Sequence, residues 1–321
     1  KLTEYEDVKQ EAIQFYQNLF TEFGSMSKQM QLRLHNVLTN KLSEQQAKLL
    51  AQSISNEEIK SALFLMKKGT APGPEGYTVE FFKSNWNTIG DDFIAAILHC
   101  FATQTMPIGL NSAILNLVPK IAHPVGMKEY KPIACCNVVY KVYSKVLTER
   151  LKSVLDGLIS NKQAAFLKGR SISGNALLMH ELVRNYHKKG GQERCVGKVD
   201  IIKAYDTVRR SFLLEVAKIL NFPPIFINWV MNCFCIARFS INLNGLLMGY
   251  FDSSRGLKQE DPISPYLFLL VMEVFTQLFD DNIRALGFDY HPRCESLKLS
   301  HIIFADDLFL MATANAKSLS T

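Results

Sequence analysis

The sequence lacks the cysteine patterns of a disulfide framework or a zinc site. Its seven cysteines are an odd number, and no two are spaced as Cys-x-x-Cys. Cys135 and Cys136 are adjacent, and Cys233 and Cys235 are two positions apart, without His or Cys partners at zinc-finger spacing. We therefore expect buried, reduced thiols and an intracellular protein.

Peptidase, membrane and repeat signals are missing as well. His180 and Glu181 are not followed by a histidine at the spacing of a zinc peptidase. The longest apolar run, residues 266–279, is too short to cross a bilayer and is interrupted by Glu273. No signal peptide, internal repeat or low-complexity stretch is visible.

The composition predicts an ordered protein with a mildly basic surface. The 321 residues are 48% hydrophobic, enough for one large domain or two subdomains. The net charge of +6 suits a nucleic-acid partner, and it suits ordinary surface charge equally well.

Two adjacent acids, Asp306 and Asp307, interrupt an apolar stretch near the end of the chain. The stretch, residues 297–312, predicts a β-hairpin with these acids at its tip. Because the two carboxylates repel each other, a cation or basic partner would compensate them, although a solvated turn is the alternative. Asp200 lies far upstream at a predicted strand end, where a helix-capping acid is the alternative. Three such acids can hold two Mg²⁺ ions roughly 3.5–4 Å apart for phosphoryl transfer.

A third segment, residues 255–268, lies between these acids. It reads Arg-Gly-Leu-Lys-Gln-Glu-Asp-Pro-Ile-Ser-Pro and then becomes strongly apolar. Two prolines and an aspartate before an apolar run predict a loop that opens a buried helix.

In this order, the three segments resemble the polymerase motifs of reverse transcriptases. The wider chain resembles the reverse transcriptase of LINE-type, non-LTR retrotransposons, most like those of plants. Further segments carry the resemblance through the rest of the chain: residues 71–77, 81–83, 86, 117–120, 130–141 and 163–172.

The resemblance implies an α+β right-hand polymerase with helix-rich fingers and a small antiparallel palm sheet. We expect an N-terminal helical extension over residues 1–53, fingers over 54–194 and a truncated palm over 195–321. Periodicity predicts helices over 8–23, 54–68, 90–103, 139–156, 207–220 and 265–286, the second with a capping signature at residues 55–59. Strands are predicted over 195–200 and 239–244, and Gly245 after the second is a hairpin signal. The chain starts at Lys1 and stops at Thr321 soon after the paired acids, so we expect a fragment whose thumb is missing.

The implied reaction is RNA-directed DNA synthesis. Asp200, Asp306 and Asp307 would be the catalytic residues and the ligands of two Mg²⁺ ions, which Mn²⁺ can replace, and the backbone carbonyl of Ile201 would reach one ion. The partners would be an RNA template, a DNA primer and deoxynucleoside triphosphates. We expect no membrane association and no obligate protein partner.

Four further residues would bind the nucleotide by the same resemblance. Tyr205 would lie under the deoxyribose and exclude a 2′-hydroxyl, with a core tyrosine on a strand face as the alternative. Gln259 would contact the sugar side, with a helix-capping role as the alternative. Lys120 and Lys131 would face the triphosphate, with solvated surface cations as the alternative. The family usually has arginine in place of Lys131.

Lys168 and Arg170 would contact the template backbone. Phosphate contacts of this kind supply affinity without reading sequence. Solvated surface cations are again the alternative.

Several positions depart from the family pattern. Glu260 stands where the family has glycine, and Arg210 stands where it usually has tryptophan in a core-facing position. We expect Glu260 to weaken nucleotide binding, and Arg210 to extend to solvent or leave a packing defect. Thr70 and Gly174 replace the usual lysine and aspartate.

Three functions therefore stay open. The leading one is the RNA-directed DNA polymerase, which the family places in the nucleus. The second is a degenerate, non-catalytic nucleic-acid-binding remnant, favoured by the departures. The third is a protein like a group II intron maturase, although residues 71–77 and the adjacent cysteines look more LINE-like.

Overall fold

Helices alternate irregularly with short strands, which confirms the predicted α+β class. The computed structural model describes residues 4–186, 193–234 and 237–319. Its helices are α1 (Tyr5–Leu19), α2 (Lys28–Val37), α3 (Glu44–Ala51), α4 (Asn56–Phe64), α5 (Val79–Ser84), α6 (Trp86–Thr103), α7 (Ile108–Asn111), α8 (Val138–Leu158), α9 (Ile172–Val183), α10 (Arg210–Ile219), α11 (Pro224–Asn232), α12 (Ser264–Leu286) and α13 (Ala316–Leu319). Its strands are β1 (Ser112–Pro119), β2 (Tyr130–Cys136), β3 (Arg194–Asp200), β4 (Arg238–Leu243), β5 (Leu246–Asp252), β6 (His301–Phe304) and β7 (Asp307–Thr313).

The described strands form two sheets rather than one. One has the order β3-β7-β6 and is antiparallel throughout. The other has the order β2-β1-β4-β5, in which β1 and β4 are parallel. The predicted hairpin after residue 239 is present as β4 and β5, but it extends the sheet begun by β1 and β2. This sheet therefore crosses the expected boundary between fingers and palm at residue 194, because strand pairing over such a sequence distance leaves no local signal.

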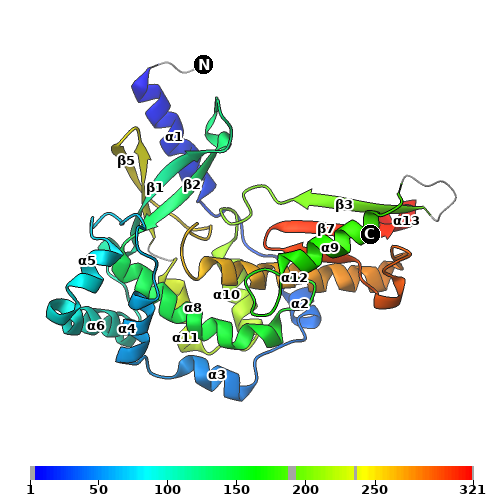
Figure 1. Cartoon of the computed structure of the whole chain (residues 1–321), viewed down its shortest axis with the longest axis horizontal. Helices are drawn as coiled ribbons and strands as arrows, with labels where there is room; N and C mark the ends of the chain where they lie inside the picture. The colour runs from blue at the N-terminus through cyan, green and yellow to red at the C-terminus, as the bar shows by residue number, and fades with distance from the viewer. Residues whose placement is uncertain (1–3, 187–192, 235–236, 320–321) are drawn as a thin grey trace.

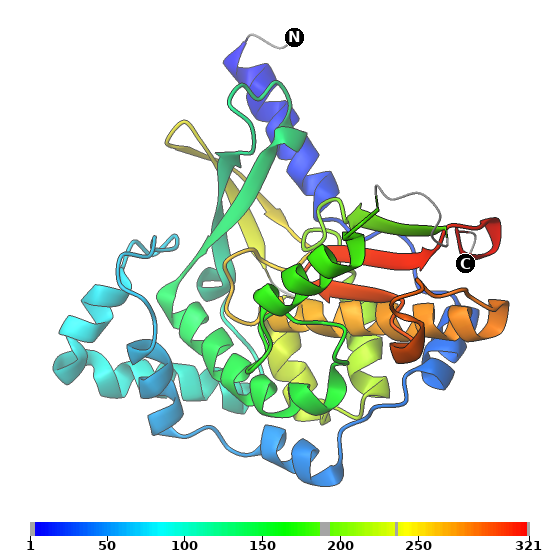
Figure 2. The same cartoon turned by 45° about the vertical axis from the view of Figure 1, so that its right-hand side comes forward.

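Helix α12 lies beside the sheet formed by β3, β7 and β6 and connects it to the other helices. It packs against α2, α8 and α10, and it runs below β7 in the view of Figure 1. Figure 2 shows α1 beside the long β1–β2 hairpin and β5, far from the helices at the base. One continuous apolar core includes side chains from α1, such as Ala12 and Tyr16, and from β7, such as Leu308. The expected N-terminal extension is thus part of the same core.

Two helix ends differ from the sequence prediction for identifiable reasons. Helix α1 ends at Leu19 rather than residue 23, because the next carbonyl, that of Phe20, accepts hydrogen bonds from a distant loop. Helix α10 begins at Arg210 rather than residue 207, because Arg209 is extended and pairs with Arg255. The capping signature of α4 is confirmed by a capping box at Ser55.

The described cysteines are free thiols, in agreement with the expectation. Cys100, Cys135, Cys136, Cys233 and Cys294 are buried, and burial raises the pKa of Cys136 to about 11. Cys195 is half-buried, and Cys235 lies outside the described residues. Within the described part of the chain, no helix is both long enough and apolar enough to cross a membrane.

Arg150 on α8 fastens the segment around α3 and α4 to the central helix. Its guanidinium forms two bonds to the Glu58 carboxylate, of 2.7 and 2.9 Å, and donates to the carbonyls of Leu50, Gln52 and Ser53. Burial of the Glu58 carboxylate raises its pKa. Hydrogen bonds from Arg150 and Ser55, together with the charge of Arg150, outweigh this effect, so the pKa is lowered. The ion pair therefore stabilises the folded state when Glu58 is ionised.

Replacing Arg150 with methionine should lower the free energy of unfolding by about 1–3 kcal/mol, because the part-buried Glu58 carboxylate and the nearby carbonyls lose their donor. Urea denaturation measures this loss. The loss should shrink in acid, since stability from a carboxylate with a lowered pKa disappears as the pH falls through that pKa. Asp156→Asn, at an exposed position of the same helix, is the control. An equal loss at acidic and neutral pH would contradict a contribution from the ion pair.

Candidate active site

Three carboxylates meet at one end of the sheet formed by β3, β7 and β6. Asp200 is the last residue of β3 and lies opposite Asp307, the first residue of β7. Phe304 also pairs with Asp307, so Ala305 and Asp306 form the turn between β6 and β7. The structure thus brings together the three acids that the sequence places more than a hundred positions apart.

The turn that carries Asp306 is fixed from beneath by Gln163. Ala305 has a left-handed backbone (φ +56°), which an alanine adopts only when its surroundings impose it. The buried Gln163 side chain accepts a 3.1 Å hydrogen bond from the Ala305 amide, and Ile303 exchanges backbone bonds with Lys162 and Ala164. Sequence analysis quoted Gln163 in a motif but assigned it no role.

Lys198 supplies the positive charge that the acids need. Lys198 precedes Asp200 by two positions on β3, and its ammonium lies 2.8 Å from a carboxylate oxygen of Asp307. Its pKa is raised, first by this hydrogen bond and then by attraction to Asp307, Asp200 and Asp306. All three carboxylates therefore lie close enough to attract the same ammonium. Sequence analysis missed this lysine.

The donor set suits a divalent cation in its chemistry. Carboxylate oxygens are the ligands that Mg²⁺ prefers, and a lysine already acts as the counter-cation at this position. With the side chains as they lie, no group of three or more His, Cys, Asp or Glu residues among those described is arranged to hold a metal ion. A metal ion on Asp307 would therefore compete with the ammonium of Lys198.

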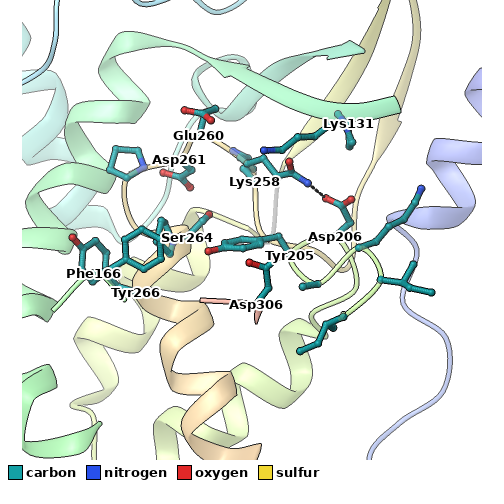
Figure 3. A pocket seen from close by; sticks show the side chains of 18 of the residues that line it. Lys131, Phe166, Tyr205, Asp206, Lys258, Glu260, Asp261, Ser264, Tyr266 and Asp306 are labelled. Carbon is teal, nitrogen blue, oxygen red and sulfur yellow. Dashed lines mark hydrogen bonds between the residues drawn. The ribbon is translucent and has the colours of Figure 1, made fainter. Parts of the chain in front are cut away.

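A cleft of about 740 Å³ opens beside the acids. Figure 3 shows Asp306 below Tyr205 and Asp206 to the right of it. Lys131 lies above Asp206, and Glu260 and Asp261 lie at the upper left of the view. The predicted residues that line it are Asp200, Ile201, Tyr205, Gln259, Lys120, Lys131 and Asp306. Asp307 is not in the lining. One cavity thus collects most of the predicted site from five separate segments.

Tyr205 lies in the turn after β3 and forms part of the cleft floor. Its ring stacks on Phe268 of α12 with centroids 4.6 Å apart and planes 20° from parallel. Burial, with a smaller contribution from the Asp306 charge, raises its pKa to about 12. The alternative of a core tyrosine on a strand face does not fit, because the residue is half-buried and in a turn.

Gln259 is held by an acid that sequence analysis did not consider. Its side-chain nitrogen donates a 2.7 Å bond to Asp206, which is almost fully buried. Burial raises the pKa of Asp206, while Gln259 and nearby lysines, Lys120 and Lys131 among them, oppose this shift. The side-chain oxygen of Gln259 is buried and has no hydrogen-bond partner among the described residues. It is therefore an acceptor left over for a ligand donor.

A buried polar cluster lies behind Gln259. The Lys258 ammonium donates to Asn111 and sits 3.7 Å from the Tyr140 ring centroid. Asp261 accepts a 2.6 Å bond from Tyr140 and another from Ser144, both on α8. Burial lowers the pKa of Lys258 and raises that of Asp261. These bonds fasten the turn around Gln259 to the central helix.

The predicted cations occupy two different environments. Lys120 follows β1 and Lys131 lies on β2, and both are exposed at the cleft. Lys168 is exposed but outside the cleft lining. Arg170 donates to the carbonyls of Ile159, Ser160 and Gln163 at distances of 2.5–3.0 Å. Its guanidinium therefore closes the end of α8, and this arrangement offers little to a phosphate.

The two main departures from the family pattern differ in their effects. Glu260 is exposed at the cleft with φ +74°, a backbone that glycine adopts without strain. Arg210, by contrast, is 5% exposed and donates to the carbonyls of Phe234, Ser253 and Arg255 and to the Ser253 hydroxyl. The expectation that Arg210 would extend to solvent or leave a packing defect was wrong, because backbone acceptors satisfy the buried guanidinium.

Comparison with known proteins finds a family pattern over most of the chain. The sequence pattern of the family described as reverse transcriptase (RNA-dependent DNA polymerase) matches residues 118–320. The chain is 28% identical to the "Transposon TX1 uncharacterized 149 kDa protein" of Xenopus laevis, over 97% of this chain and 23% of that protein.

Two further relatives carry the name of one element. The chain is 26% identical to the "Retrovirus-related Pol polyprotein from type-2 retrotransposable element R2DM" of Drosophila melanogaster, over 76% of this chain and 22% of that protein. It is also 26% identical to the "Retrovirus-related Pol polyprotein from type-1 retrotransposable element R2" of Nasonia vitripennis, over 83% of this chain and 24% of that protein. The chain thus spans about a quarter of the length of these curated relatives.

Replacing Lys198 with methionine should tighten binding of a divalent cation about threefold or more, because the ammonium no longer competes for Asp307. Mn²⁺ titration followed by electron paramagnetic resonance measures this affinity. Lys218→Met, which removes an exposed lysine beside Glu215, is the matched control and should change nothing. Unchanged or weaker binding in the Lys198 variant would contradict competition between lysine and metal.

Replacing Glu260 with glycine should raise the free energy of unfolding by about 0.5–1 kcal/mol, because glycine has no Cβ to oppose a positive φ. Glu260→Gln keeps the backbone strain and removes only the charge, so it should leave stability unchanged. Urea denaturation of both variants tests this difference. Equal stabilisation by the two substitutions would show that the charge, rather than the backbone, is unfavourable.

Proposed function

The chain belongs to the reverse transcriptase (RNA-dependent DNA polymerase) family, and on this premise we propose that it carries out RNA-directed DNA synthesis as part of a longer non-LTR retrotransposon protein. The main support is the meeting of Asp200, Asp306 and Asp307 beside a cleft lined by lysines. In this reaction a primer 3′-hydroxyl attacks the α-phosphate of a deoxynucleoside triphosphate, and pyrophosphate leaves. Insertion into chromosomal DNA would place the activity in the nucleus.

The acids would hold the metal ions of the reaction. Members of the family use divalent metal ions, and we propose two Mg²⁺, with Mn²⁺ as a substitute, on Asp200, Asp306 and Asp307. When bound, these ions would activate the attacking oxygen and stabilise charge on the leaving one. The Ile201 carbonyl directly follows Asp200 and would add a further oxygen ligand.

The remaining cleft residues would bind and orient the nucleotide. Lys120 and Lys131 would neutralise the triphosphate as point charges at the exposed side of the cleft. Tyr205 would support the deoxyribose, since its ring is fixed against Phe268 and has little freedom to yield to a 2′-hydroxyl. Gln259, held by Asp206, would offer its unused oxygen to the sugar side. Positioning of this kind supplies much of the catalysis in phosphoryl transfer.

The template and primer would lie outside the nucleotide cleft. Exposed Lys168 remains our candidate for a template-phosphate contact, and Arg170 would act indirectly by closing α8. We assign residues 54–194 to the fingers and 195–321 to the palm, with the sheet formed by β2, β1, β4 and β5 spanning the two.

The second candidate, a non-catalytic remnant, is favoured by Glu260. Its exposed carboxylate at the cleft would repel a triphosphate, and its backbone is strained. The intact acids and their shared register favour the polymerase. The third candidate, an intron maturase, is less favoured, because the three relatives described above carry the names of transposable elements.

Replacing Asp306 with asparagine should reduce primer extension at least about a hundredfold without unfolding the chain, because a neutral amide cannot replace a carboxylate at a metal. Mg²⁺-dependent incorporation on an RNA template is the measurement. Asp92→Asn, an exposed position on α6, is the control. No incorporation by the folded, unsubstituted chain would favour the remnant, and equal incorporation by the Asp306 variant would contradict the assigned site.

A further inference from the structure

Helix α1 contacts both of the loops that form the nucleotide cleft. We call residues 200–208 the aspartate loop and residues 253–260 the glutamine loop. Figure 1 and Figure 2 both show α1 beside β1, β2 and β5, at the outer side of this region. The family pattern matched residues 118–320 and so did not include α1. Its contacts nevertheless fall on the two loops that present Tyr205 and Gln259.

The first contact is between aromatic rings and a lysine of the aspartate loop. The Lys203 ammonium lies 4.2 Å from the ring centroid of Phe15 and 5.9 Å from that of Tyr16. It is buried and has no hydrogen-bond partner among the described residues. Since a buried ammonium without such partners is unfavourable, the face of the Phe15 ring and the charge of Asp206 are what compensate it.

The second contact is between the end of α1 and the glutamine loop. The Phe20 carbonyl accepts bonds from the amides of Ser254 and Arg255, at 2.9 and 3.0 Å. The Arg255 side chain donates a 2.6 Å bond to the Leu19 carbonyl. The Phe20 ring lies so close to Gly256 that an added Cβ would come within 3.0 Å of it. The end of the helix therefore fixes where the glutamine loop begins.

The two loops are also bonded to each other. The amides of Gly256 and Leu257 donate to the carbonyls of Val208 and Tyr205, both at 2.8 Å. The 2.7 Å bond from Gln259 to Asp206 continues this series into the cleft. A shift of either loop would therefore move the other, and with it the surface on which a nucleotide would rest.

We infer that α1 is a positioning element of the nucleotide cleft, and that Phe15 acts by holding Lys203 and the aspartate loop in place. This inference rests on the proposed polymerase function for its kinetic consequence, but its structural part does not. Phe15 is a positioning residue, since it acts on the cleft only through Lys203.

Hydrogen exchange of the full chain tests the structural part without any activity. Phe15→Leu keeps an apolar side chain but removes the ring, so the amides of Gly256 and Leu257 should exchange about fivefold faster. Lys203→Met removes the ammonium that the ring compensates, so Phe15→Leu should have little further effect in that background. Tyr5→Leu, an exposed aromatic position on the same helix, should have no effect. Unchanged exchange in Phe15→Leu, or fully additive effects, would overturn the inference.

Primer extension tests the kinetic part. Phe15→Leu should raise the KM for the deoxynucleotide about fivefold with little change in kcat, and Phe15→Tyr should restore the original KM. Wild-type KM in Phe15→Leu would overturn the kinetic inference. If Phe15→Leu shows the faster exchange while the unsubstituted chain shows no incorporation, the proposed function is refuted and the positioning role stands.

Discussion

The pairing of β3 with β7 is the constraint on which the site depends. Seven residue pairs, ending with Asp200 opposite Asp307, set its register. A slip of one residue would send the side chain of Asp200 to the other face of the sheet. β3 is largely exposed and cannot fix this register by burial, whereas β7 buries Leu308 and Met311. The hairpin is thus anchored in the core and through Gln163, and β3 takes its position from the hairpin.

The cleft separates opposite charges. Asp200 and Asp306 line one end, with Asp307 and Lys198 beside it. Lys120, Lys131 and Lys203 line the other end, with Asp206 among them. Burial raises the pKa of Asp206 and lowers that of Lys203, so each group is unfavourable without its neighbours. A ligand that brings a metal cation and a polyphosphate would complete both ends at once, which accords with the chemistry of a nucleotidyl transfer.

The departures from the family pattern show how the surroundings decide the effect of a substitution. Arg210 is tolerated because three backbone carbonyls and a hydroxyl lie within reach of its fork of donors. Glu260 keeps a left-handed backbone that glycine would adopt freely, and its charge faces the cleft. From the sequence alone, both positions read as decay. In the structure only Glu260 bears on the proposed chemistry.

The sequence by itself determined the α+β class, the positions of six of the thirteen described helices, the β4–β5 and β6–β7 hairpins and the placing of the three acids at strand ends. These features have local signals: apolar periodicity, capping residues such as Ser55, and acids at strand ends. Only the tertiary structure decided the parallel pairing of β1 with β4, the capping role of Arg170, and the contacts of Lys198 and Asp206. It also decided that α1 contacts the two loops that form the cleft. Each of these depends on segments far apart in the chain, whose meeting is set by packing of the whole core rather than by any local preference.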